Sequence, residues 1–309
     1  MKASTFKLDS TNGCQVHVNV WLPDEDTEMK GIVQIAHGMT ETSDRYERFA
    51  VKLTAAGYAV YANDHLGHGQ TAESESKLGH LDKDDMMNMV RDMERLSCYA
   101  RQQHPDAPLI LFGHSMGSFL AQMYLSLYGN QLDGVVLCGS NGPQGPELLA
   151  GIALSRAIAD IKGWTHRSAI ITHMAFGGFN RRFKPHKTDY DWLSRDEAEV
   201  QKYIDDPHCG YVCTVGFYHE FFKLLRKIHQ PELMRAIPKA LPVLMIAGTE
   251  DPVSSYGKGV PKLAEMYRGL DIHDVTLIMY PEARHELLNE TNRDEITADC
   301  LDWLNRVTG

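Results

Sequence analysis

The sequence predicts an α/β protein with a mostly parallel central sheet, helices on both of its faces and a helical insertion between two late strands. Three observations lead to this class. Short apolar runs recur along the chain without the alternation of half-buried strands, which is typical of parallel strands covered on both faces. Segments with a helical spacing of apolar residues follow most of these runs. This rhythm stops between Asn141 and about Pro238, where helical patterns continue without a strong strand pattern.

The predicted elements begin with an antiparallel hairpin. Residues 14–22 alternate apolar and polar side chains, and Asn12-Gly13 favours a tight turn that pairs them with residues 6–8. Apolar runs predict parallel strands at 32–36, 58–61, 109–112, 135–137, 243–247 and 275–279. Apolar residues at helical spacing predict helices at 46–53, 86–96, 120–127, 260–267 and 296–304. Strands and helices that alternate in this way favour a parallel sheet with helices on both faces.

The insertion is predicted to be entirely helical. Ser194-Arg195-Asp196-Glu197 has the pattern of a capping box that opens one helix, and residues 211–228 have the spacing of another. We therefore expect a core formed by residues 1–140 and 239–309, with residues 141–238 as a helical cap.

Composition narrows the class of function. The chain has 309 residues, of which 43% are hydrophobic and 23% charged, as in a soluble globular protein, and its net charge of −10 argues against nucleic acid as a partner. No apolar stretch is long enough to span a bilayer, and the first residues lack the apolar segment of a signal peptide, so we expect a cytoplasmic protein. The six cysteines include no C-x-x-C pair and are expected to be free thiols.

The strongest chemical signal is Gly113-His114-Ser115-Met116-Gly117. This G-x-S-x-G motif lies between a predicted strand and a predicted helix, which is the context of a nucleophile elbow. The glycines are needed because a turn this sharp brings the helix and the strand too close together for side chains. We therefore predict that Ser115 is a catalytic nucleophile.

A serine nucleophile needs a histidine that accepts its proton and an acid that orients the histidine. Candidates should follow the late strands in the order serine, acid, histidine. Asp251 follows the strand at 243–247, and His285 follows the strand at 275–279. Glu250 competes with Asp251 for the role of the acid, and we favour Asp251 because Pro252 would fix its turn.

The developing oxyanion requires two backbone donors. One is expected from Met116, directly after the nucleophile, and the other from Met39, in the loop after the strand at 32–36. His37 in the same loop is expected to be a buried structural histidine.

Together these motifs resemble the α/β-hydrolase fold, and specifically its monoacylglycerol lipase and lysophospholipase-like branch. The resemblance covers almost the whole chain and rests on five motifs in the expected order: His37-Gly38, Asp64-His65-Leu66-Gly67-His68-Gly69, the elbow at 113–117, Asp251-Pro252, and residues 284–290. It implies that Ser115, Asp251 and His285 form the triad, that Met39 and Met116 are the oxyanion donors, and that the insertion covers an acyl pocket.

We therefore predict a serine hydrolase of carboxylic esters that uses no metal or organic cofactor. The expected substrate is an ester with a medium or long acyl chain, such as a monoacylglycerol or a lysophospholipid. Apolar side chains of the cap support this expectation: Ile152, Leu154, Ile158, Trp164, Ile170, Met174, Phe176 and Phe179. The basic run at 181–187 is by default expected to be a solvated loop, and the more specific hypothesis is transient contact with an anionic lipid surface. A small-molecule carboxylesterase or thioesterase, or a non-catalytic binding protein of the same fold, are the alternatives.

Three other patterns carry less weight. Gly67-His68-Gly69-Gln70-Thr71-Ala72 imitates a dinucleotide fingerprint, but a polar and acidic segment follows it instead of a helix. His208, Cys209, Cys213 and His219 lack the spacing of a zinc site, and the two cysteines at helical spacing favour core packing. His285-Glu286-Leu287-Leu288-Asn289 lacks the second histidine of H-E-x-x-H, and the loop after His37 lacks the His-Gly-Gly-Pro-Gly pattern of proline aminopeptidases.

Overall fold

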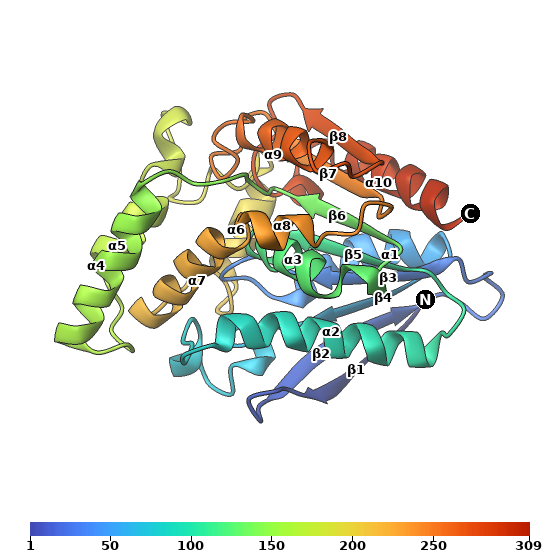
Figure 1. The fold of residues 1–309 in the computed structure, drawn as a ribbon, viewed down its shortest axis with the longest axis horizontal. Coiled ribbons are helices and arrows are strands. Elements are labelled where there is room, and N and C mark those ends of the chain that lie inside the picture. Colours follow the sequence, from blue (N-terminus) through green and yellow to red (C-terminus); the bar gives the residue numbers. More distant parts are fainter.

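A computed structural model describes the whole chain, residues 1–309, as a single sheet covered by helices (Figure 1). The strands are β1 (Lys2–Asp9), β2 (Gln15–Leu22), β3 (Gly31–Ala36), β4 (Tyr58–Asn63), β5 (Leu109–His114), β6 (Gly134–Cys138), β7 (Val243–Gly248) and β8 (Val275–Tyr280). They lie in the order β1-β2-β4-β3-β5-β6-β7-β8, and all neighbours from β4 to β8 are parallel. Only β1 with β2 and β2 with β4 pair in the antiparallel direction. The predicted α/β class with its mostly parallel sheet is therefore confirmed.

Helices cover both faces of the sheet, as the uninterrupted apolar strands require. They are α1 (Glu47–Ala55), α2 (Asp85–Gln103), α3 (Met116–Tyr128), α9 (Gly259–Arg268) and α10 (Arg293–Thr308). Successive residues of a strand point to opposite faces, so Ile32 of β3 packs in the core with α2, α3 and α9, while Val33 packs in the core with α1 and α10. None of the helices combines the length and the apolar character that a membrane crossing requires.

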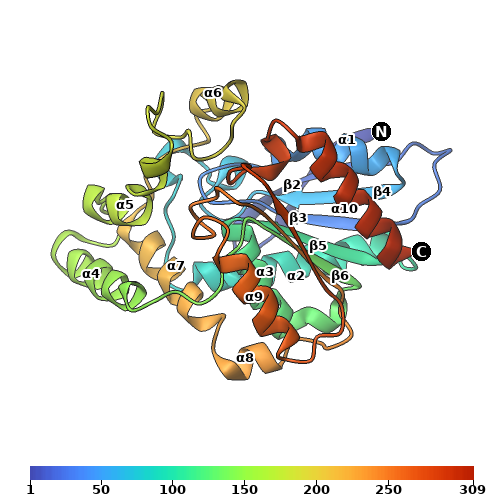
Figure 2. The same cartoon turned by 90° about the horizontal axis from the view of Figure 1, so that it is seen from above.

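The segment between β6 and β7 is helical. It contains α4 (Glu147–Lys162), α5 (Ala169–Phe176), α6 (Glu197–Asp205), α7 (Val215–Lys227) and α8 (Pro231–Arg235). Helix α7 packs against α2 and α3 of the core on one side and against α4 on the other. Helices α4 and α5 therefore form the outer part of the segment, farthest from the sheet, as both views show (Figures 1 and 2).

Short 3-10 helices complete the chain: η1 (Ser43–Tyr46), η2 (Gly69–Thr71), η3 (Glu75–Lys77), η4 (Gly129–Gln131), η5 (Phe179–Arg182) and η6 (Leu287–Asn289). The predicted hairpin and all six predicted parallel strands are present, with ends that differ by a few residues from those expected. All six cysteines are free thiols, as predicted.

Two local predictions inside the insertion need correction. Asp196, not Ser194, caps α6, because the Asp196 carboxylate accepts hydrogen bonds from the first-turn amides while the Ser194 hydroxyl donates to the Asn289 carbonyl. Cys209 and Cys213 do not share a helix face. Both are buried, but they lie before α7 and in separate apolar clusters.

Candidate active site

Ser115 lies in a sharp turn between β5 and α3. Its backbone dihedrals, φ 50° and ψ −119°, lie outside the regions that a residue with a side chain normally adopts. Close packing around the turn maintains this strained backbone. The packing leaves no space for a side chain at Gly117, where a Cβ atom would lie 2.0 Å from the Ala36 carbonyl oxygen. The Ser115 amide also donates to the Cys138 carbonyl of β6 at 3.0 Å. The sequence thus forms the tight strand-turn-helix geometry that its glycines predict, with the serine at its apex.

His285 and Asp251 form a buried pair. Asp251 follows β7 and His285 follows β8, so parallel strands bring the two loops to the same edge of the sheet as Ser115. The His285 Nδ1 atom lies 3.0 Å from the Asp251 Oδ1 atom, and both side chains are almost fully shielded from solvent. The amide of Val253 donates to the same carboxylate oxygen at 2.8 Å and fixes its orientation. A carboxylate in this position holds the histidine with its proton on Nδ1 and leaves Nε2 as the basic atom.

The structure separates the two candidate acids. Glu250 has a partly exposed carboxylate that lies 3.6 Å from the Arg182 guanidinium, at the surface. Asp251 alone reaches His285. Of the two carboxylates, that of Asp251 is therefore the one in a position to orient the histidine.

The His285 ring lies beside the elbow. Its centroid is 4.9 Å from that of His114, the residue before Ser115, and a Cβ on Gly139 would lie 3.1 Å from the ring. No hydrogen bond joins the Ser115 hydroxyl to His285 in this structure. Such bonds between catalytic groups tend to be long without substrate and to tighten in the complex.

Two backbone amides without an acceptor lie next to Ser115, at the positions that the sequence predicts: Met116 follows it in the chain, and Met39 follows Gly38, whose Cβ position would be 3.1 Å from the Ser115 Cβ. The backbone N–H groups of Met39 and Met116 form no hydrogen bond within the chain. Met116 is buried, and a buried N–H without an acceptor is rare. As the first residue of α3, it also lies at the positive end of the helix dipole. Both amides are therefore available to a negatively charged oxygen.

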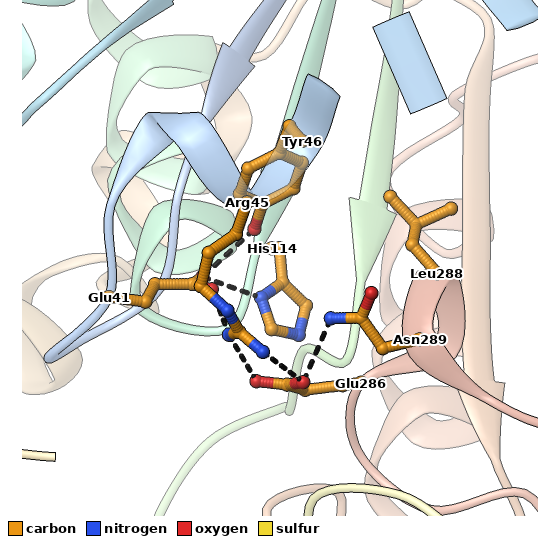
Figure 3. A pocket seen from close by; sticks show the side chains of 7 residues that line it. All are labelled: Glu41, Arg45, Tyr46, His114, Glu286, Leu288 and Asn289. Carbon is orange, nitrogen blue, oxygen red and sulfur yellow. Dashed lines mark hydrogen bonds and ion pairs between the residues drawn. The ribbon is translucent and has the colours of Figure 1, made fainter. Parts of the chain in front are cut away.

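A buried charged network, made of Glu41, Arg45, Tyr46, His114, Glu286 and Asn289, lies next to the site (Figure 3). One Glu41 oxygen accepts from the Gly38 amide, from the Tyr46 hydroxyl at 2.9 Å and from His114 Nδ1 at 3.1 Å. The other accepts from Arg45 at 2.7 Å. Arg45 also donates two hydrogen bonds to Glu286, at 2.6 and 2.8 Å. The network connects the loop of Met39 to the loop of His285.

The network shifts the pKa values of its members. Burial disfavours the charged form of Glu41, but the hydrogen bond and charge of His114 and the charge of Arg45 outweigh it and hold the pKa of Glu41 well below its usual value. Burial likewise disfavours the charged form of His114, but the hydrogen bond and charge of Glu41 prevail and raise the pKa of His114. Both shifts therefore favour the ionised form of the group concerned, the carboxylate at Glu41 and the imidazolium at His114.

Sequence reasoning did not find this network. Arg45 and Glu286 are 241 residues apart in the chain, and charged residues are by default expected at the surface. The only local signals are the spacing of four residues between Glu41 and Arg45 and the place of His114 inside the elbow motif.

The remaining histidines of the motifs have a structural role. His37 is buried, and its Nε2 atom accepts a hydrogen bond from the His65 amide at 2.9 Å. Burial lowers the pKa of His37, which keeps the ring neutral as this bond requires. The Asp64 carboxylate accepts from the amides of Ser43 and Gln70, at 2.9 and 2.8 Å, so the segment that imitates a dinucleotide fingerprint forms a turn beside the site.

The chain is similar to several known ester hydrolases over nearly its whole length. The chain is 30% identical to a monoacylglycerol lipase of Mycolicibacterium smegmatis over 306 residues, which are 97% of this chain and 96% of the relative. It is 28% identical to the human monoglyceride lipase over 96% of this chain and 88% of that protein. The structure matches a thermostable carboxyl esterase from Bacillus coagulans with a TM-score of 0.92 and 29% identity, over the full length of both chains.

Residues 27–292 match the family model described as serine aminopeptidase, S33. The relatives of the chain include monoacylglycerol lipases and a probable lysophospholipase, so the description of the family model does not by itself define the reaction. The chain belongs to the serine aminopeptidase S33 family and is a carboxylic ester hydrolase of the α/β-hydrolase fold, similar to the monoacylglycerol lipases.

Proposed function

We propose that the chain hydrolyses monoacylglycerols, with Ser115, His285 and Asp251 as its catalytic triad. The observation that carries the proposal is the buried pair of His285 and Asp251 beside a strained serine at the turn between β5 and α3. In the first step the Ser115 Oγ atom bonds to the acyl carbon while His285 Nε2 accepts the hydroxyl proton. The negative charge that develops on the carbonyl oxygen is held by the N–H groups of Met39 and Met116.

His285 then returns the proton to the leaving alcohol as the bond between the acyl carbon and that alcohol breaks, which completes the first half of the reaction and leaves the acyl group on Ser115. Water then attacks the acyl-enzyme while His285 accepts one of its protons, and the Ser115 hydroxyl is regenerated with release of the fatty acid. Asp251 stabilises the imidazolium that forms in both halves and stays ionised throughout.

We propose residues 141–238 as a cap over the acyl chain. Aromatic side chains of this segment extend to the catalytic histidine: the Trp192 ring lies 5.2 Å from the His285 ring, and Phe179 and Phe176 lie 4.9 and 6.2 Å from Trp192. Their apolar surface suits a long acyl chain. The monoacylglycerol lipases that match this chain over nearly its full length support the same substrate.

The cap also carries apolar side chains that face solvent. In α4, Ile161 is 82% exposed, and in α5 Ile170 is 63% exposed. Exposed apolar residues and a nearby basic run at 181–187 suit transient docking to an anionic lipid surface. Sedimentation with anionic and neutral vesicles tests this part of the proposal, and equal absence of binding to both would refute it.

The likeness to the carboxyl esterase supports a second candidate, a small-molecule esterase with the same triad. Hydrolysis of p-nitrophenyl esters of graded acyl length, with monoacylglycerol and lysophosphatidylcholine alongside, separates the two. Activity that rises with acyl length and extends to monoacylglycerol supports the lipase. Activity confined to short esters supports the small-molecule esterase.

The triad is tested in the same assay. Ser115→Ala should abolish turnover, and a fluorophosphonate should label the natural chain but not the variant. Turnover that survives in Ser115→Ala would refute Ser115 as the nucleophile. A folded natural chain that neither turns over esters nor reacts with the probe would support a non-catalytic binding protein.

A further inference from the structure

Thr40, the residue after the proposed oxyanion donor Met39, has a backbone conformation that is unfavourable for a threonine. Its φ angle is 55°, in the left-handed region, where a β-branched residue is strained. Such a conformation persists only when the surroundings hold it. The contacts that hold Thr40 come from the segment between β6 and β7.

Two residues of that segment bind Thr40. The Gly210 amide donates to the Thr40 carbonyl at 3.0 Å, and the Tyr203 hydroxyl, from α6, lies 2.8 Å from the Thr40 hydroxyl. The Thr40 hydroxyl in turn donates to the Met39 carbonyl at 2.8 Å. Tyr190 supports the arrangement by donating to the Gly210 carbonyl at 2.9 Å.

Proton counting fixes the direction of these bonds. The Thr40 hydroxyl has one proton, which it donates to Met39, so the Tyr203 hydroxyl must be the donor in the bond between the two side chains. Tyr203 is buried, with its ring under the Arg45 guanidinium at 4.9 Å. Burial raises the pKa of Tyr203 well above its usual value, which keeps the hydroxyl protonated as a donor.

On the basis of the proposed function, we propose that Tyr203 is a positioning residue for the oxyanion site. It orients the Thr40 hydroxyl toward the Met39 carbonyl and so fixes the peptide plane between Met39 and Thr40. This plane adjoins the one that carries the Met39 N–H, so fixing it restricts the direction of that N–H. The site for the oxyanion is then complete only while the segment from Tyr203 to Gly210 lies on the loop. The same segment that covers the substrate therefore sets the strength of catalysis.

The direct test is Tyr203→Phe, which removes one hydroxyl and keeps the ring on Arg45. We expect kcat to fall about ten-fold with little change in KM, which is less than the 10²–10³-fold cost of losing a whole oxyanion donor. The affinity for an alkyl trifluoromethyl ketone, whose hemiketal oxygen occupies the same site, should fall by the same factor. The matched control is Tyr58→Phe, which removes the hydroxyl of a buried tyrosine that donates to Asn305 at 3.1 Å, at the start of β4 and thus at the opposite end of the strands from the loop. It should leave all three values unchanged.

A double-mutant cycle tests the route through Thr40. Thr40→Val keeps the β-branched shape and loses the hydroxyl, so it should lower kcat at least as much as Tyr203→Phe. Adding Tyr203→Phe to Thr40→Val should then have no further effect. Two independent, additive losses, or an unchanged kcat in Tyr203→Phe, would overturn the proposal. Labelling of Ser115 by a fluorophosphonate in every variant separates this result from a failure of the proposed triad.

Discussion

The buried carboxylate of Glu41 offers a quantitative test of the charged network. Glu41→Gln keeps the shape of the side chain and removes its charge. The amide retains one acceptor oxygen, so at least one of the four donors that now contact the carboxylate must face an NH₂ group. Removing one partner of a buried ionic group costs about 3–5 kcal/mol of folding free energy.

The structure places the expected loss at the lower end of that range. Arg45 keeps its two hydrogen bonds to Glu286, so its charge stays compensated. The amide oxygen can still serve the Gly38 amide, Tyr46 and His114, so the loss falls on the bond to Arg45 and on the negative charge beside His114, and we expect the free energy of unfolding to fall by about 3 kcal/mol. Urea unfolding at pH 7, followed by tryptophan fluorescence, measures it.

A matched change at the surface is the control for this measurement. Glu25→Gln alters a carboxylate that is 82% exposed and pairs with Lys2, and it should leave the unfolding free energy unchanged within error. A loss below about 1 kcal/mol in Glu41→Gln would refute the reasoning, because the network would then contribute no more than one ordinary neutral hydrogen bond.

Three further predictions follow from the site. Asp251→Asn should lower kcat by about 10⁴-fold because the histidine loses its orienting anion, whereas Glu250→Gln should leave kcat nearly unchanged; equal losses in an ester assay would contradict the assignment. Gly117→Ala should destabilise the fold by at least about 1–3 kcal/mol, because its Cβ would lie 2.0 Å from a backbone oxygen, while Gly142→Ala, with neighbours at 3.4 Å or more, should be tolerated in thermal unfolding. The pKa of His114 is raised in the folded state, so its contribution to stability should be complete below about pH 6.5 and be lost as pH rises through the folded value; urea unfolding between pH 6 and 9 should show a decline that His114→Gln lacks.

The sequence predicts the sheet and the triad because both have local signals. A doubly buried strand is a continuous apolar run, and each residue of the proposed triad lies within five residues after such a strand. Once the strands are parallel, their carboxyl ends meet at one edge, so residues as distant as Ser115 and His285 come together without any further signal. The glycines of the elbow have equally local causes, since each fills a position where a Cβ would clash.

The supporting residues have no such signal. The roles of Glu41, Glu286 and Tyr203 become visible only from the residues that they contact. Those contact residues come from distant segments of the chain, whose relative position depends on the complete fold. Ser194 shows the same limit on a smaller scale. The local sequence around Ser194 fits a helix cap, but its hydroxyl instead donates a hydrogen bond to the Asn289 carbonyl. Asn289 is close to Ser194 in space and far from it in the sequence. Local pattern thus predicts the reacting groups, and tertiary packing alone determines what orients them.

The connection from β6 to β7 has a consequence for how such chains diversify. The two strands are parallel neighbours, so the chain must leave one end of the sheet and return to the other, whatever the reaction. A crossover connection is therefore required, but the topology does not restrict its length or its structure. Insertions can accumulate there without moving a single strand, and they begin at the edge of the sheet where Ser115 lies. Proteins with this topology can therefore differ in substrate through changes in this one connection, while the strands and the loops that carry the reacting groups stay the same.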